Sequence, residues 1–185
     1  MLKLTARCRH VMHMLGWQPQ QPHPAAASMV LEHCDIGDLR DLKKSHENFS
    51  VEFPEGLTWH VLKSVSLALA FLATGHGTEN YGHGSWVSIV HRDIKPANIL
   101  LKRDSTSPFP QVKLTDLGIA GLSGRHGYQE DVHDSRVGTP FWQAPEFPKS
   151  STSADLWALG AVVDFLALKV TPYDAAEYMR AVGTR

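Results

Sequence analysis

The chain has 185 residues, of which 43% are hydrophobic and 20% are charged, and its formal net charge is −1. This length and apolar content suit one globular domain with a real core. The near-neutral, interspersed charge excludes the basic surface of a nucleic-acid-binding protein.

The sequence predicts no secretion signal and no membrane span. The start, MLKLTARCRHVMHML, lacks the apolar core of a signal peptide. The longest apolar stretch, SVSLALAFLATG, is far shorter than the roughly 18–20 residues that cross a bilayer. The two cysteines, Cys8 and Cys34, give no disulfide framework. We therefore expect an intracellular protein, cytoplasmic or nuclear.

The first half of the chain predicts both strands and a helix. Segments 10–17 and 26–34 are expected to be strands, joined by a solvated loop rich in proline and glutamine. From Gly56 to Ala73 apolar residues recur at helical spacing. Segment 88–101 is expected to form a strand, a loop and a second strand, and segment 112–118 a further strand.

The second half predicts a long loop and an apolar helix. Residues 121–136 follow neither a helical nor a strand period, and a long loop in a compact domain is typically functional or disordered. From Asp155 to Leu168 almost every face is apolar, which is typical of a helix at the centre of a protein. Thr152 followed by Asp155 resembles a capping box at its start. Too little chain follows Leu168 to cover such a helix.

The segment with the clearest chemistry is HRDIKPANIL, residues 91–100. Taken alone, Asp93 is more simply explained as a turn or capping residue than as a catalyst. Lys95, Asn98 and the later Asp116 change this, because loops between strands can aim short polar side chains into one cleft. Asn98 and Asp116 carry the hard oxygen ligands that Mg²⁺ takes. Asp93 could accept a hydroxyl proton and Lys95 could offset phosphoryl charge, as phosphoryl transfer requires.

Four motifs resemble, in order and spacing, the signature set of eukaryotic protein kinases. They are HRDIKPANIL, DLG at 116–118, GTPFWQAPE at 138–146 and DLWALG at 155–160. Lys95 after Asp93, together with the GTP segment, resembles the serine/threonine type.

This resemblance implies an α+β, partial protein-kinase-like fold. Residues 1–31 would be a remnant of the small-lobe sheet with two strands, and residues 32–38 the hinge. Residues 39–185 would form a mainly helical, partial large lobe, with the activation segment at 116–146.

The resemblance also implies a role for each polar motif residue. Asp93 corresponds to the acid that orients the substrate hydroxyl and accepts its proton, and Lys95 to the lysine that contacts the γ-phosphate of ATP. Asn98 corresponds to the second ligand for magnesium. Asp116 corresponds to the aspartate that holds Mg²⁺ across the β- and γ-phosphates, and Leu117 replaces the usual phenylalanine.

The segment MVLEHCDIGDL resembles the end of a strand followed by the hinge. Leu31 would then occupy the gatekeeper position. The backbone of Glu32 and Cys34 would hydrogen-bond adenine, and Asp38 would meet the ribose.

Regulation is implied by Arg92, because kinases with this arginine are commonly switched by a phosphate that pairs with it. Ser135 is the expected site for an upstream activating kinase, and Ser123 is a weaker candidate. Thr139 is expected in the substrate-docking wall and in the hydrogen-bond network of Asp93. Asp155 is expected to brace the catalytic loop.

Two weaker patterns are not promoted to sites. Cys8, His10 and His13 lack a fourth ligand for a metal. The GHGTEN segment lacks a third glycine and follows a helix, so a loop insertion explains it better than a phosphate-binding loop.

Two functions follow. The first is a serine/threonine kinase catalytic fragment that uses ATP and Mg²⁺ to phosphorylate Ser and Thr hydroxyls of a protein substrate. The alternative is a non-catalytic, pseudokinase-like or truncated module that binds a partner protein. Intact Asp93, Asn98 and Asp116 favour the first. The glycine-rich loop, the strand lysine, the C-helix and the last large-lobe helices are not found, which favours the second for this chain alone.

Overall fold

The computed structural model describes residues 7–20, 22–78, 86–122, 133–134 and 136–168. Within these ranges the helices are α2 (Leu39–Asn48), α3 (Glu55–Thr74) and α4 (Thr152–Leu168), with a 3-10 helix at Pro96–Asn98. The strands are β1 (Met14–Pro19), β2 (Ala27–Leu31), β3 (Gly37–Asp38), β4 (Ile89–Val90), β5 (Ile99–Lys102), β6 (Gln111–Leu114), β7 (Gly121–Leu122), β8 (His133–Asp134) and β9 (Lys149–Ser150). This mixture confirms the expected α+β class.

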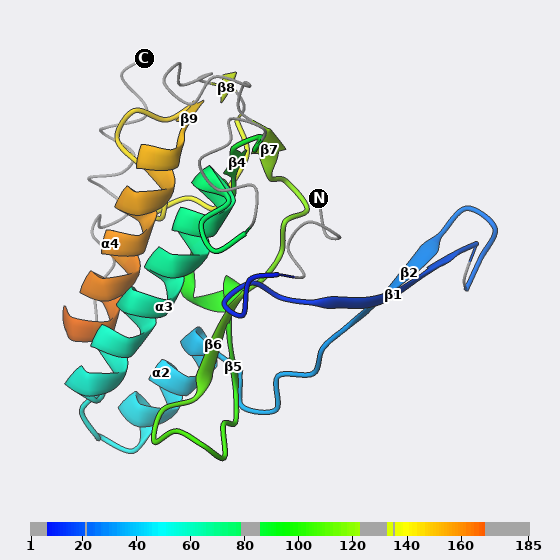
Figure 1. Ribbon diagram of the computed structural model, residues 1–185. Helices are drawn as coiled ribbons and strands as arrows, with labels where there is room; N and C mark the ends of the chain where they lie inside the picture. The colour runs from blue at the N-terminus through cyan, green and yellow to red at the C-terminus, as the bar shows by residue number, and fades with distance from the viewer. Residues whose placement is uncertain (1–6, 21, 79–85, 123–132, 135, 169–185) are drawn as a thin grey trace.

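Helices α3 and α4 pack against each other and lie side by side (Figure 1). Strands β3, β5 and β6 form an antiparallel sheet whose β6 strand contacts α3. The β1–β2 hairpin extends away from the helices (Figure 1). A parallel bridge from Val11 to Leu114 joins the segment before this hairpin to β6.

Helix α3 is confirmed, one residue longer at each end than the apolar pattern predicts. It ends at Gly75, whose φ of +70° suits a residue without a side chain. An added Cβ at Gly75 would lie 2.7 Å from the Trp86 ring, and Trp86 Nε1 donates to the carbonyl of Leu72 (2.9 Å). By length and composition α3 could cross a membrane. Its buried residues pack against α4, β4 and β6, as those of a core helix do.

Helix α4 is confirmed, but the capping box predicted for Thr152 and Asp155 is wrong. Ser151 caps the helix instead, because its Oγ accepts from the N–H of Ala154 (3.1 Å). Asp155 binds another segment of the chain. One face of α4 is buried, while Leu156 and Leu168 are 56% and 63% exposed among the described residues.

The predicted strands differ from the observed ones at their ends. The first begins at Met14 rather than at residue 10, because the backbone of His10 and Met12 bonds to Leu114 of β6. The strand predicted at 112–118 ends at Leu114. Thr115 donates instead to the carbonyl of Asn98. The long loop at 121–136 includes short strands at its two described ends, β7 and β8.

Helix α2 was not predicted from the sequence. Asp38 caps it, accepting from the N–H of Asp41 (2.8 Å). Only two of its ten residues, Leu39 and Lys43, are buried, so it carries little of the apolar repeat that identifies a helix.

Two leucines of α3 provide a test of the core. Leu72 is 1% exposed and Leu67 is 36% exposed. We expect Leu72→Ala to lower the free energy of unfolding by about 2–5 kcal/mol, because it leaves a cavity. Leu67→Ala makes the same change in helix propensity and should lower the free energy of unfolding by less than about 1 kcal/mol. Urea unfolding of both variants checks this, and equal losses would contradict it.

Candidate active site

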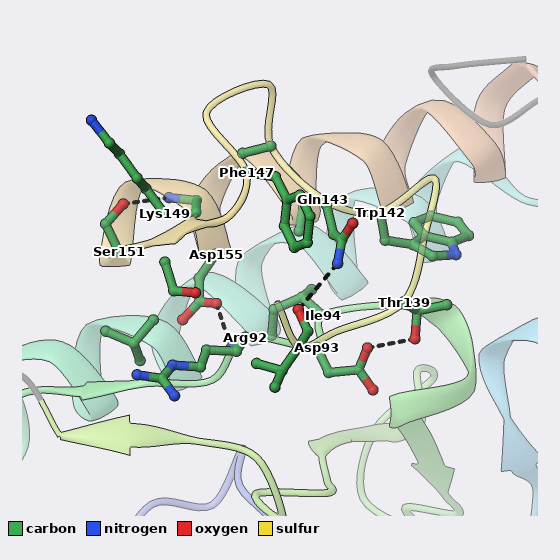
Figure 2. Close-up of a pocket in the computed structure, with 16 residues that line it drawn as sticks. Arg92, Asp93, Ile94, Thr139, Trp142, Gln143, Phe147, Lys149, Ser151 and Asp155 are labelled. Atoms are coloured by element: carbon green, nitrogen blue, oxygen red, sulfur yellow. Dashed lines mark hydrogen bonds between the residues drawn. The ribbon is translucent and has the colours of Figure 1, made fainter. Parts of the chain in front are cut away.

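The loop that carries Asp93 is held from behind by α4. One carboxylate oxygen of Asp155 accepts from the backbone N–H of His91 (2.7 Å) and the other from that of Arg92 (2.9 Å; Figure 2). Asp155 is only 4% exposed. These bonds fix the loop where Arg92 adopts a φ of +71°, so the bracing role expected for Asp155 has a geometric basis.

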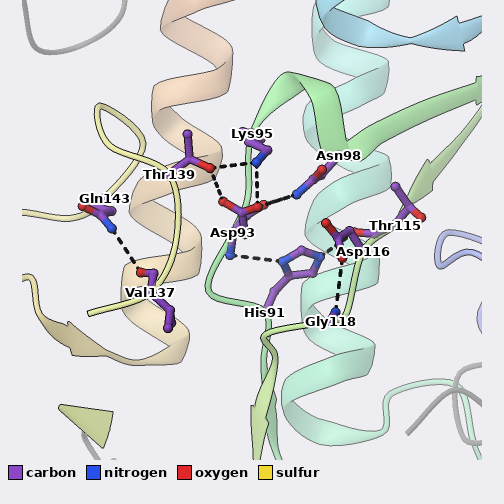
Figure 3. Close-up of polar contacts among 10 residues, drawn as sticks. All are labelled: His91, Asp93, Lys95, Asn98, Thr115, Asp116, Gly118, Val137, Thr139 and Gln143. Atoms are coloured by element: carbon purple, nitrogen blue, oxygen red, sulfur yellow. Dashed lines mark hydrogen bonds and ion pairs between the residues drawn. The ribbon is translucent and has the colours of Figure 1, made fainter. Parts of the chain in front are cut away.

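His91 joins the same loop to the end of β6. Its Nδ1 accepts from the N–H of Asp93 (3.3 Å), which leaves Nε2 protonated to donate to the carbonyl of Thr115 (2.8 Å; Figure 3). Burial lowers the pKa of His91, so the ring is neutral at physiological pH. The histidine therefore positions Asp93 next to the segment that leads to Asp116.

The carboxylate of Asp93 is the centre of a polar cluster (Figure 3). Its Oδ2 accepts from Lys95 Nζ (2.7 Å) and Asn98 Nδ2 (2.9 Å). Its Oδ1 accepts from the hydroxyl of Thr139 (2.6 Å), which in turn accepts from Lys95 Nζ (2.7 Å). The structure thus brings four predicted site residues together.

The electrostatics of this cluster keep Asp93 ionised. Burial alone would raise its pKa, but hydrogen bonds from Lys95, Thr139 and Asn98 and the charge of Lys95 bring the pKa below its ordinary value. A buried, ionised carboxylate that already accepts one hydroxyl proton donor is equipped to orient another.

Asp116 stands at the edge of the cluster. It is exposed and has a φ of +64°, and its Oδ1 accepts from the N–H of Gly118 (3.3 Å). The Thr115 N–H donates to the carbonyl of Asn98 (3.0 Å), which brings the two predicted metal ligands onto adjoining segments.

The donor set here suits a hard cation. The amide nitrogen of Asn98 is committed to Asp93, which leaves Oδ1 as its ligand atom, and Asp116 supplies a carboxylate. Within the described ranges no group of three or more His, Cys, Asp and Glu side chains forms a ready-made metal site. Mg²⁺ commonly takes one or two protein oxygens and completes its shell with phosphate and water.

A cavity of about 450 Å³ lies between the β1–β2 hairpin and the end of β6. It is lined by Val11, Met12, Met29, Leu31, Leu114, Thr115, Asp116, Leu117 and Gly118. Its wall is mostly apolar, with the Asp116 carboxylate at its border. Leu31 and Leu117, both singled out from the sequence, lie in this wall.

The predicted nucleotide-contacting residues Glu32, Cys34 and Asp38 do not line the cavity. The carboxylate of Glu32 binds Lys113 (2.7 Å). Asp38 caps α2 and pairs with Arg40 (3.3 Å). Cys34 is half-buried, and burial raises the pKa of its thiol.

Arg92 packs against the segment that follows Asp116, predicted above as the activation segment. Its guanidinium lies so close to Gly121 that an added Cβ there would overlap it, and its side chain points away from Asp93 (Figure 2). Among the described residues, its buried Nε has no hydrogen-bond partner. The predicted phosphosites Ser135 and Ser123 lie outside the described residues.

Gly138 lies directly against the loop. Its φ is +103°, and an added Cβ would approach the carbonyl oxygen of Arg92 to 2.6 Å. Gln143 Nε2 donates to the carbonyl of Val137, the residue before Gly138 (3.1 Å). This hydrogen bond was not predicted from the sequence. A lone glutamine carries no signal that would have revealed this bond.

Comparison with known proteins decides the family. A model of the protein kinase domain matches residues 1–183. The chain belongs to the eukaryotic protein kinase family. Its relatives place this partial kinase domain in the serine/threonine type, as the resemblance predicted.

Three relatives illustrate the match. The chain is 36% identical over 157 residues to serine/threonine-protein kinase ppk11 of Schizosaccharomyces pombe, covering 83% of this chain and 43% of that protein. It is 29% identical to the G2-specific protein kinase nimA of Emericella nidulans, covering 83% and 23%. It is 35% identical to cytokinesis protein sepH of Aspergillus niger, covering 84% and 10%. This kinase chain therefore spans less than half the length of these relatives.

The buried carboxylate of Asp155 gives the kinase a pH-dependent stability term. Burial raises its pKa to about 6 from an ordinary 3.8, although the N–H donors of His91 and Arg92 oppose the rise. Between these two pKa values the Asp155 carboxyl holds a proton in the folded state that it has lost in the unfolded state. The free energy of unfolding therefore falls as the pH rises from about 4 to about 6, and this group no longer changes it above about pH 6.

Asp155→Asn is neutral throughout and should remove this slope. Relative to it, the parent chain should lose about 3 kcal/mol of unfolding free energy across that pH range. Urea unfolding of both proteins at several pH values measures the difference. A difference that does not change with pH would show that Asp155 titrates normally.

Proposed function

We propose that this chain carries the phosphotransfer centre of a serine/threonine protein kinase, which moves the γ-phosphoryl group of ATP to a protein hydroxyl. The observation that carries this is the Asp93 carboxylate, ionised and bound by Lys95, Asn98 and the Thr139 hydroxyl. Phosphoryl transfer depends mainly on positioning and charge neutralisation, and this cluster supplies both.

Each residue of the cluster has a task in this proposal. A substrate hydroxyl binds Asp93 beside the Thr139 hydroxyl, and Asp93 orients it and takes its proton. Lys95, 2.7 Å from Asp93 and from Thr139, offsets charge on the γ-phosphoryl group. Asn98 and Asp116 would hold Mg²⁺, which would supply positive charge to neutralise the phosphate oxygens.

In this proposal the nucleotide base occupies the cavity between the β1–β2 hairpin and the end of β6. The apolar wall of the cavity, including Leu31, suits a purine ring, and Asp116 at its border suits the phosphate end. The backbone of Glu32 and Cys34, which follows Leu31 but does not itself line the cavity, bonds adenine where the base extends past Leu31, and Asp38 contacts the ribose while it caps α2. The domain division follows from this assignment: the small-lobe remnant is residues 1–31, the hinge is residues 32–38 and the partial large lobe is residues 39–185.

The reaction implies a protein substrate with Ser or Thr, and ATP together with the free thiols of Cys8 and Cys34 suits an intracellular setting. The alternative, a non-catalytic module that binds a partner protein, draws support from the exposed Leu156 and Leu168 of α4. A measurement of phosphotransfer by the chain distinguishes the catalytic proposal from this alternative.

Asp93→Asn tests the catalytic proposal. The amide keeps the size of the side chain but cannot accept a proton, so kcat for peptide phosphorylation should fall about 10²- to 10⁴-fold. Asp164→Asn makes the same change at an exposed position of α4 and should leave kcat unchanged. A parent chain with no more phosphotransfer than the Asp93 variant would favour the partner-binding module.

The activation proposal concerns Arg92, whose buried Nε has no partner among the described residues. A phosphate on Ser135 would pair with this guanidinium and order the segment. We expect phosphatase treatment and Ser135→Ala each to lower the phosphotransfer rate, and Arg92→Met to abolish the response to phosphatase. Mass spectrometry of active protein with Ser135 unmodified would contradict this.

A further inference from the structure

A buried ion cluster outside the phosphotransfer centre joins the predicted hinge to β6. The carboxylate of Glu32 accepts from Lys113 Nζ (2.7 Å), from Lys102 Nζ (3.3 Å) and from the backbone N–H of His13 (3.0 Å). The Glu32 side chain is 10% exposed and that of Lys113 is 3% exposed. None of these bonds involves Asp93 or its partners.

The carboxylate of Glu32 is held in its ionised form. Burial alone would raise the pKa of Glu32, but the hydrogen bonds from Lys113 and His13 bring it below its ordinary value. Taking both charges out of water is costly, so such a pair contributes little net stability compared with apolar residues of the same size. The role of such a pair is therefore better explained by the chain segments that it holds in place than by a gain in stability.

That geometry links the two ends of the nucleotide site. Glu32 lies directly after β2, at the start of the segment whose backbone takes adenine in the proposed function. Lys113 lies in β6, and the chain reaches Asp116 three residues later. The Leu114 N–H donates to the carbonyl of His10, and its carbonyl accepts from the N–H of Met12, which binds β6 to the segment before the hairpin (2.8 Å each).

We propose that the Glu32–Lys113 ion pair is a positioning element of the nucleotide site, which fixes the backbone of segment 32–34 relative to Asp116. This rests on the proposed function and adds to it side chains that touch neither ATP nor the reacting hydroxyl. Lys102 is 38% exposed and 3.3 Å away, so it assists the pair without determining it.

Lys113→Met tests the pair, with Lys43→Met as a matched control. Lys43 is equally buried, at 1% exposed, and its Nζ donates to the carbonyl of Leu166 at the end of α4 (2.7 Å). Both variants should lower the midpoint of thermal unfolding. Lys113→Met should weaken binding of Mg·ATP about tenfold, measured as Kd by calorimetry, while Lys43→Met should change it less than about twofold.

A double variant separates positioning from stability. Glu32→Gln combined with Lys113→Met leaves no uncompensated buried charge, so the unfolding midpoint should recover. The pair is still absent, so the Kd for Mg·ATP should remain about tenfold weaker than in the parent chain. A merely structural role would restore the Kd together with the midpoint.

Four results would overturn the inference: an unchanged Kd in Lys113→Met, an equal loss in Lys43→Met, recovery of the Kd in the double variant, or faster phosphotransfer by Lys113→Met. The last would mean that the pair restrains the kinase. A parent chain that binds Mg·ATP but transfers no phosphoryl group would contradict the proposed function and leave the Kd comparison decisive. A parent chain that binds no Mg·ATP would overturn both.

Discussion

The pair of hydrogen bonds that the backbone N–H groups of His91 and Arg92 donate to Asp155 is the constraint on which the site depends. These bonds attach an irregular loop to α4, the helix that packs on α3 in the core. The loop is also held by the short strands β4 and β5 at its two ends and by the bond of His91 to the carbonyl of Thr115, but only the Asp155 bonds attach it to α4 among the hydrogen bonds described above. A carboxylate with two acceptor oxygens suits this task, because it can satisfy adjacent N–H groups at once.

From that attachment, a chain of hydrogen bonds runs outward to the surface. His91 binds both Asp93 and Thr115, Thr115 binds the backbone of Asn98, and Asn98 returns to Asp93. Thr139 then joins a later segment of the chain to the same carboxylate. A closed set of this kind has little freedom to rearrange, so the charged groups around Asp93 are held in one arrangement.

The sequence was most informative where local pattern determines structure. The long apolar helix α3 and the motif loop around Asp93 followed from spacing and motif order, because each signal lies within a short stretch. Helix α2 could not be predicted in this way, since it buries only Leu39 and Lys43. The ion pair of Glu32 with Lys113 was also missed, because its partners are far apart in the chain and meet only in the folded structure.

Gly138 determines how tightly the segment that carries Thr139 can lie on the loop that carries Asp93. With hydrogen in place of a side chain, its backbone reaches the carbonyl of Arg92, at a φ that other residues adopt only under strain. The two segments are therefore in direct main-chain contact, one residue from Thr139. No side chain at position 138 lies between the two segments, so a shift of one bears directly on the backbone of the other. A single methyl group added at position 138 would separate the two surfaces while Asp93, Lys95 and Thr139 remained in the sequence.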